Sequence, residues 1–451
     1  MNIISSYGVK IKADTYRPIN QTVEVTTKAV RFFVDAFYKE WDYMNTVLDN
    51  VTSNEAMGFM ESLTHKTKNR PIVKYDFDSK FYKMPSGIRR YCINKAFGMV
   101  SSYKTNLDNW NMKQKGKRPS FPKVKREMPV FYKSEYNEVS DYCLKLKVYN
   151  GSDWVWLQVK LKKSDADYLK HHFADNKASS PVLEKRYKNY YLRYAFEEKV
   201  SLNKTPIKQQ KILAVDLGIN NAATCSVMLA DGTVLARKFC KLTREKDRLK
   251  HELNKIKQSQ QHGSVKMPRK WAKAKGLNRD IAVKTASFIM ETAISYDVDT
   301  IVFEHLDLQH KKRGSKKQKL HMWRANDVQI IVTHKAHRNG IRVSHVNPWG
   351  TSRLAYDGTG KVERGFYTVN GVRKYNYSIC IFSSGKQYHC DLNASYNIGA
   401  RYFIRELLKS LNENLRLQVL TKVSELATRS RCVLASLIKL NAVINGCLDC
   451  C

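Results

Sequence analysis

The stretch KILAVDLGINNAATCSVMLADGTVLARKF, residues 211–239, decides the fold of the second half of the chain. It holds three short apolar segments, KILAVD, AATCSVML and TVLARKF, each about as long as a β-strand. Asp231-Gly232 separates the last two segments, and this pair is a strong signal for a tight hairpin. The stretch therefore predicts a three-stranded antiparallel meander whose first strand ends on a carboxylate, Asp216.

Beyond the meander, the chain alternates helices with two further strands. Apolar residues recur at helical spacing in two segments, and two short apolar runs are typical of buried strands. The predicted elements are helices at 244–258 and 278–298, strands at 299–306 (DTIVFEHL) and 341–348 (IRVSHVNP), hairpins at 349–390, and a helix from Asp391 onward. This order of meander, helices, strand, insert and closing helix is that of the RNase H-like layout.

Three carboxylates stand at the ends of these predicted elements. Asp216 ends the first strand, Glu304 ends the later strand, and Asp391 begins the last helix. A charge at the end of an apolar strand is costly unless it is paired or binds a metal. Three carboxylates on neighbouring elements can hold two divalent ions about 3.5–4 Å apart, an arrangement that hydrolyses phosphodiesters. Because all the ligands are oxygen atoms, the pattern predicts Mg²⁺, with Mn²⁺ as a substitute.

The charge balance indicates a polyanionic partner. The 451 residues include 79 Lys and Arg against 41 Asp and Glu, a net charge of +38. Such a charge repels itself unless a polyanion offsets it, so nucleic acid is the first candidate and an anionic membrane surface the second. No apolar run approaches the roughly 18 residues of a spanning helix, and no secretory signal pattern is present. Ten scattered cysteines indicate a reducing compartment.

The first half of the chain predicts strands on either side of a helical region. Residues 1–12 and 130–200 alternate apolar with polar or basic residues, which is typical of half-buried strands in a curved sheet or small barrel. Between them, 24–48 and 85–106 have helical spacing. The segment 111–126 holds seven basic residues and no acidic ones. It predicts a loop that contacts phosphates and stacks on a base, with a solvated linker as the alternative.

The combination of motifs resembles the TnpB family of transposon-encoded, RNA-guided nucleases and the miniature type V CRISPR effectors. AVDLGINN (214–221) is similar to the family's first RuvC motif, IVFEHL (301–306) to its second, and DLNASYNIGAR (391–401) to its third. VNPWGTS (346–352) is similar to the segment that leads into the family's zinc ribbon. The resemblance implies that the catalytic, metal-binding residues are Asp216, Glu304 and Asp391.

One departure from the family concerns the zinc ribbon. The family has two CxxC pairs in this insert, a spacing that is a strong zinc signal. Here the first pair is absent and the second survives at most as Cys380 with Ser383, while Cys390 is out of register. Zinc held by two cysteines with His345 or His389 is an alternative that no spacing supports. We therefore expect no structural zinc, and an insert held by aromatic side chains: Phe366, Tyr367, Tyr375, Tyr377 and Phe382.

The resemblance also orders the domains. It implies a multi-domain α+β protein with a β-barrel wedge domain, an inserted helical recognition lobe, and an RNase H-like RuvC nuclease domain that carries a hairpin insert, a degenerate zinc ribbon. The expected boundaries are 1–20 and 129–205 for the wedge, 21–128 for the recognition lobe, 206–345 and 391–451 for the nuclease domain with its C-terminal helices, and 346–390 for an insert that binds target nucleic acid.

The implied function is RNA-guided DNA endonuclease activity at a single RuvC two-metal site, with the sequence read by guide–target pairing. The guide comes from a transposon end or a CRISPR array. The implied partners are this guide RNA and double- or single-stranded target DNA, with one protein monomer per RNA and no membrane, in the cytoplasm of a prokaryote on the nucleoid. Two alternatives stay open: an RNA-guided DNA-binding protein that does not cut, and an unguided RNase H-fold nuclease or transposase.

The residues expected to contact nucleic acid lie in basic stretches. The first set is Lys113, Lys115, Lys117, Arg118, Phe121 and Lys123, and the second is Lys311, Lys312, Arg313, Lys316, Lys317 and Lys319. A third stretch, 241–276, holds twelve Lys and Arg against three Asp and Glu. Because all three stretches are basic with few acids, we expect their Lys and Arg side chains to contact phosphates and not bases.

Overall fold

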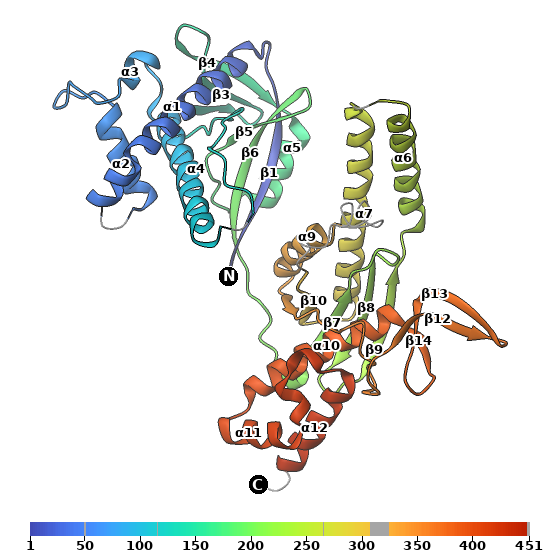
Figure 1. The fold of residues 1–451 in the computed structure, drawn as a ribbon. Helices are drawn as coiled ribbons and strands as arrows, with labels where there is room; N and C mark the ends of the chain where they lie inside the picture. Colours follow the sequence, from blue (N-terminus) through green and yellow to red (C-terminus); the bar gives the residue numbers. More distant parts are fainter. Residues whose placement is uncertain (49–50, 115, 265, 307–323, 449–451) are drawn as a thin grey trace. The chain divides into compact units, whose positions relative to one another are not determined.

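The computed structural model describes residues 1–48, 51–114, 116–264, 266–306 and 324–448 (Figure 1). The chain divides into two compact units, Asn2–Glu198 and Lys199–Cys451 with Met1. The predicted basic stretch 311–319 and Lys115 lie outside the described residues. Among the helices that are described, none is long and apolar enough to cross a membrane.

The first unit, Asn2–Glu198, is built on a six-stranded sheet of order β2-β3-β4-β1-β6-β5. Its strands are β1 (Asn2–Lys12), β2 (Tyr136–Ser140), β3 (Cys143–Tyr149), β4 (Trp154–Leu161), β5 (Val182–Arg186) and β6 (Asn189–Lys199). The predicted alternation is visible in β3, where Leu144, Leu146 and Val148 are buried and the residues between them are not. The N-terminal strand lies between β4 and β6, so strands from far along the chain hold it in place.

Helices lie beside this sheet. They are α1 (Arg17–Val47), α2 (Ser53–Thr64), α3 (Phe77–Lys80), α4 (Ser86–Lys113) and α5 (Lys163–Phe173). Four of them, α1 to α4, form a second core, and α5 packs on β1. Helix α1 begins earlier than predicted because Pro18 stands in its first turn, where a proline is favourable. The sequence did not predict α5. Its only two buried residues are Ala166 and Phe173, which is too few for a helical apolar pattern.

The second unit is built on a five-stranded sheet of order β11-β10-β7-β8-β9. Its strands are β7 (Lys211–Asp216), β8 (Ala223–Leu229), β9 (Val234–Cys240), β10 (Thr300–Glu304) and β11 (Arg342–Val346). The predicted meander is present: β7, β8 and β9 pair antiparallel, and Gly232 turns the chain between the last two at φ +96°. Strand β10 then pairs parallel with β7, and β11 parallel with β10.

Helices cover both faces of this sheet. They are α6 (Thr243–Gln261), α7 (Pro268–Ser295), α9 (Ala325–Arg338), α10 (Cys390–Ser410), α11 (Glu413–Lys422) and α12 (Leu434–Leu448). Ile212 and Ala214 of β7 pack in one core with α10 and α12, whereas Leu213 and Val215 pack in another with α7 and α9. Burial on both faces explains why β7 is apolar at nearly every position. Helix α7 begins at Pro268. The sequence predicted a start at 278, because the first turns are mostly polar and have no helical spacing of apolar residues.

The insert is a separate three-stranded sheet of β12 (Glu363–Val369), β13 (Val372–Ile381) and β14 (Gln387–His389). Its small core joins Phe382, Cys380 and Cys390 with the rings of Tyr356 and Tyr388. Of the aromatic residues expected to hold it, Phe382 is buried, and Tyr375 is 52% exposed with its ring close to Gly365 of β12. Phe366, Tyr367 and Tyr377 have side chains outside the described part of the structure.

Candidate active site

Three carboxylates that are far apart in the sequence lie at one end of the five-stranded sheet. Strands β7 and β10 run parallel with Val215 opposite Phe303, so their next residues, Asp216 and Glu304, leave the sheet at the same end. Helix α10 packs on β7 and β8 and carries Asp391 in its first turn. The fold thus places Asp216, Glu304 and Asp391, the three predicted site residues, at the same end of the sheet.

The other two carboxylates of the candidate site act electrostatically on Asp216. Burial, and the negative charges of Glu304 and Asp391, raise the pKa of Asp216 well above its ordinary value, while the guanidinium of Arg364 opposes the rise. Desolvation and like charges both disfavour the ionised form of a carboxyl group. Strongly perturbed pKa values of this kind are typical of functional sites.

Asp391 is held by the loop that follows β7. The Nδ2 atom of Asn221 donates to Asp391 Oδ2 at 2.8 Å. One residue earlier, the carbonyl oxygen of Asn220 accepts a hydrogen bond from the ammonium group of Lys246. The loop is tight, because a Cβ atom at Gly218 would lie 2.8 Å from the carbonyl oxygen of Asn221. Asn221 was not among the predicted site residues, although it is the last residue of the motif that contains Asp216.

Glu304 is held from another direction. The hydroxyl of Thr351 donates to Glu304 Oε1, and this hydroxyl oxygen also lies 3.1 Å from the carbonyl oxygen of Pro348. Thr351 is only 2% exposed. The backbone carbonyl of Glu304 accepts from the side chain of Gln329 at 2.9 Å. Thr351 belongs to the VNPWGTS motif, so this motif contributes a residue to the carboxylate site as well as leading into the insert.

A polar stripe on α10 anchors the loop that carries Thr351. Asn393, Asn397 and Arg401 recur every four residues and therefore share one face of the helix. Asn397 donates to the carbonyl oxygens of Thr351 and Leu354, each at 2.9 Å. Arg401, buried at 5% exposure, donates to the carbonyl oxygens of Asn347 and Trp349 at 2.8 and 2.7 Å. The third motif thus supplies Asp391 and also fixes the segment that positions Glu304.

The candidate zinc ligands have other roles. His389 caps α10, because its Nδ1 accepts from the backbone N–H of Asp391 at 3.2 Å. Cys380 and Cys390 are both buried in the core of the insert. Within the described ranges, no group of three or more His, Cys, Asp or Glu side chains is placed to hold a metal ion. For Mg²⁺ this is not a conflict, because Mg²⁺ keeps several waters and binds through one or two carboxylates plus substrate phosphates.

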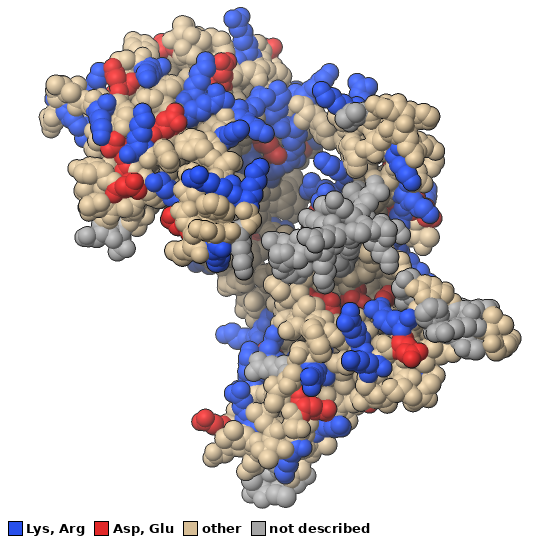
Figure 2. All heavy atoms as spheres, in the orientation of Figure 1, with Lys and Arg blue, Asp and Glu red and all other residues tan. Residues whose placement is uncertain are grey.

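The first basic stretch lies on the surface of the first unit. Lys113 ends α4, and the guanidinium of Arg118 stands 5.8 Å from the Trp110 ring centroid. Phe121 is 37% exposed and packs edge-on against Tyr38, with ring centroids 5.0 Å apart. On the face of the molecule in Figure 2, Lys and Arg side chains are spread widely, with fewer Asp and Glu between them.

Three protein families match successive parts of the chain. Residues 5–150 match the Aq_aa04 family, residues 192–309 match OrfB_IS605, described as a probable transposase, and residues 326–398 match the Cas12f1-like TNB domain. "Uncharacterized protein aq_aa04" of Aquifex aeolicus (strain VF5) is 31% identical over 127 residues, which are 25% of this chain and 70% of that protein. "TnpB-like protein aq_aa05" of the same organism is 27% identical over 242 residues, 48% of this chain and 76% of that protein.

A solved structure shares the fold. The protein in "Cryo-EM structure of the Cas12f1-sgRNA-target DNA complex" superposes with a TM-score of 0.50 at 13% identity, over 84% of this chain and 81% of that chain. At this identity the likeness concerns the fold alone, which is a mixed α/β, multi-domain architecture. The family matches and the curated relatives confirm the resemblance that the motifs indicated. The relative of 31% identity shows that the chain belongs to the Aq_aa04 family, and its second half is similar to TnpB-like proteins and to the Cas12f1-like TNB domain.

Proposed function

We propose that the chain is an RNA-guided DNA endonuclease that cuts its target at Asp216, Glu304 and Asp391. The observation that carries this proposal is the meeting of three carboxylates at one end of a sheet of order β11-β10-β7-β8-β9. An antiparallel meander followed by two parallel strands is the strand order of the RNase H-like fold. A carboxylate cluster at that place in the fold suits phosphodiester hydrolysis.

Divalent metal ions fit this donor set. The three side chains offer only oxygen ligands, which hard cations prefer. The raised pKa of Asp216 reflects burial together with repulsion by Glu304 and Asp391, and a bound cation would offset that repulsion. Two Mg²⁺ ions held by these carboxylates would supply an activated water and stabilise the leaving oxygen of the phosphodiester.

The residues around the carboxylates would position them for this reaction. Thr351 fixes the carboxylate of Glu304, and Asn221 fixes that of Asp391. Partners of this kind orient ligands before the substrate arrives, so less reorganisation is needed during the reaction. The buried anchors on α10, Asn397 and Arg401, would keep the Thr351 loop in the same place.

The partners follow from the charge and from the solved relative. That relative forms a complex with an sgRNA and target DNA, and a net charge of +38 suits a protein that neutralises such polyanions. We infer that base pairing with the guide selects the target and that the protein contacts the backbone. In this proposal the first unit holds the guide, and the insert at 346–390 contacts the target strand.

The test begins with the RNA that co-purifies with the protein. Sequencing this RNA identifies the guide, and a DNA duplex matched to it is then incubated with the complex and Mg²⁺. We expect cleavage that EDTA stops and that Asp216→Ala, Glu304→Ala and Asp391→Ala each abolish while target binding persists. Glu291→Ala is the matched control, because it removes a carboxylate from α7, outside the candidate site. Guided binding without cleavage by the wild type would support a binding-only protein, and cleavage of unmatched DNA would support an unguided nuclease.

A further inference from the structure

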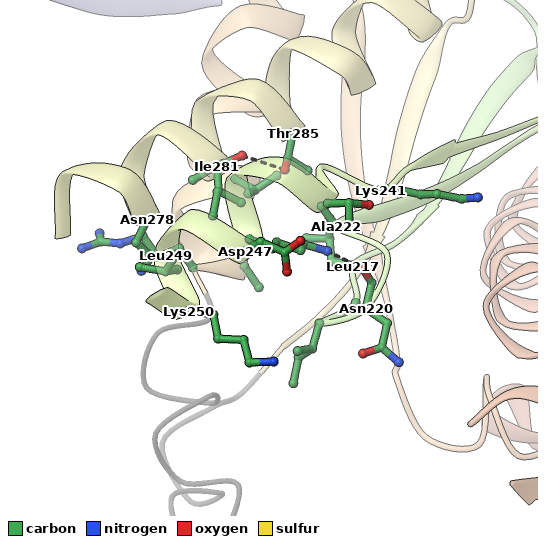
Figure 3. Close-up of a pocket in the computed structure, with 18 of the residues that line it drawn as sticks. Leu217, Asn220, Ala222, Lys241, Asp247, Leu249, Lys250, Asn278, Ile281 and Thr285 are labelled. Carbon is green, nitrogen blue, oxygen red and sulfur yellow. Dashed lines mark hydrogen bonds between the residues drawn. The ribbon is translucent and has the colours of Figure 1, made fainter. Parts of the chain in front are cut away.

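A cavity of about 590 Å³ lies beside the candidate active site (Figure 3). Its walls come from the loop after β7, from α6 and α7, and from the beginning of α9. Leu217 lines it and directly follows Asp216, while Asn220 lines it and directly precedes Asn221, the partner of Asp391. One short loop therefore joins the cavity to two of the three carboxylates.

The interior of the cavity is largely apolar. Its apolar lining consists of Leu217, Ile219, Ala222, Leu249, Leu253, Ile281, Ala282, Ala325 and Val328. Ile219 remains 39% exposed, and Leu249, Leu253 and Ile281 are only half-buried. Apolar side chains that line a concave site favour an apolar or aromatic ligand, and the volume is in the range of about 300–1,000 Å³ that small-molecule pockets have.

The polar part of the lining contains both positive side chains and a carboxylate. Lys246 and Lys250 line the cavity from α6, and Asp247 stands between them in the sequence. Figure 3 shows Lys250 and Asn220 on one side of the cavity, with Ile281 and Thr285 on the opposite side. Lys246 donates to the Asn220 carbonyl, which uses one of the three donors of an ammonium group. The lysines can therefore bind phosphate, whereas Asp247 repels it and accepts N–H donors instead.

We infer that this cavity binds one unpaired nucleobase of the strand that is cut, with the adjoining backbone phosphates on Lys246 and Lys250. The identity of that strand rests on the proposed function; the base-binding chemistry does not. A base has two apolar faces for Leu253 and Ile281, and its edge carries N–H groups for Asp247. Only a base outside a double helix can enter, so the cavity favours single-stranded DNA at the cutting site.

The test compares two short DNA strands in EDTA, where no cleavage occurs. One strand carries a single 2-aminopurine flanked by abasic sites, and the other is fully abasic; both carry the same end label. The full chain should bind the first strand about tenfold more tightly, as expected for one stacked base. Ile281→Trp fills the cavity and should bind both strands equally. Ile294→Trp, on the same helix at a position that is 55% exposed and does not line the cavity, should keep the preference.

A second variant that fills the cavity keeps the test valid if Ile281→Trp does not fold. Leu253→Trp enters the cavity from α6 and should remove the tenfold preference in the same way, with thermal melting reporting the fold of each variant. Equal binding of both strands by the wild type would overturn the inference, as would an unchanged preference in folded Ile281→Trp and Leu253→Trp. A preserved preference in a chain that cuts no guided target would support base binding and contradict only the nuclease proposal.

Discussion

The Asp216 carboxyl group lies where burial and two neighbouring carboxylates oppose its ionisation. The folded chain therefore binds this proton more tightly than the unfolded chain does. By linkage, the group's contribution to stability is fully present below the pKa of the unfolded chain, about 3.9. It is lost as the pH rises through the raised pKa of the folded state. In the absence of metal, the site thus destabilises the fold at neutral pH.

Asp216→Asn should consequently stabilise the metal-free protein while it abolishes cleavage. We expect a melting temperature higher by about 2–4 °C at pH 7.5, which corresponds to about 1 kcal/mol for a unit of this size. At pH 5 the gain should be smaller, because the raised pKa makes the wild-type carboxyl group take up its proton as the pH falls. Thermal melting in EDTA at both pH values measures this, with Glu291→Gln as the control. A gain that is the same at pH 5 and pH 7.5 would contradict the electrostatic cause.

Thr351 tests the positioning of Glu304. Thr351→Val keeps the shape of the side chain but removes the hydroxyl that donates to Glu304. We expect the single-turnover cleavage rate to fall by about tenfold or more, as for other partners that orient metal ligands, with target binding unchanged. Thr351→Ser keeps the hydroxyl and should retain most of the rate. A serine variant as slow as the valine variant would show that the methyl group matters and not the hydrogen bond.

At the scale of the element, α10 does more than its sequence pattern reveals. Its period predicts that Asn393, Asn397 and Arg401 share a face, and a polar face usually indicates exposure to solvent. The structure buries this face against the segment 347–356. The sequence could not predict which loop covers the helix, because every residue has a backbone carbonyl and the sequence does not show which ones accept these hydrogen bonds. The strand ends, in contrast, could be predicted, since Asp216 and Glu304 each end an apolar run.

Asn397→Ala should therefore destabilise the second unit and slow cleavage together. It leaves the carbonyl oxygen of Thr351 and the N–H of Leu434 without the Asn397 amide, while the Leu354 carbonyl keeps its hydrogen bond from Asn393. Each unsatisfied buried group costs about 1–3 kcal/mol, so we expect a clear fall in melting temperature. Asn339→Ala, at an exposed helix end, is the matched control. Unchanged melting of the Asn397 variant would mean that water replaces the amide.

At the scale of the whole molecule, the motifs predicted the family, whereas the nucleic-acid partner and the domain boundaries stay predictions. The Aq_aa04 family matches 5–150, within the first unit, while the TNB domain match lies in the second. The barrel expected for the wedge is a six-stranded sheet, and no pairing of its edge strands β2 and β5 is found among the described residues. Alternating strands predict a curved sheet; whether it closes depends on tilt and stagger, which the pattern does not contain.

The first unit carries exposed basic side chains that are free to meet nucleic acid. Lys117, Arg118 and Lys123 are exposed and make no ion pair with a carboxylate in the described part of the chain, so we expect them to contact phosphates. Each phosphate contact releases counterions and adds about −0.7 to the salt slope for single strands or −0.9 for duplex. Replacing all three with Gln should weaken RNA binding and flatten the slope by about 2–3.

Its control removes the same charge from lysines that are already paired. Lys66, Lys162 and Lys170 lie in the same unit, and each forms an ion pair with an aspartate. Replacing them with Gln leaves three aspartates without their lysine partners but removes few phosphate contacts, so the slope should change little. Binding titrations of one RNA at a series of salt concentrations compare the two variants. Equal slopes in both would show that net charge alone drives binding, and a change in the preferred target sequence would contradict backbone contacts.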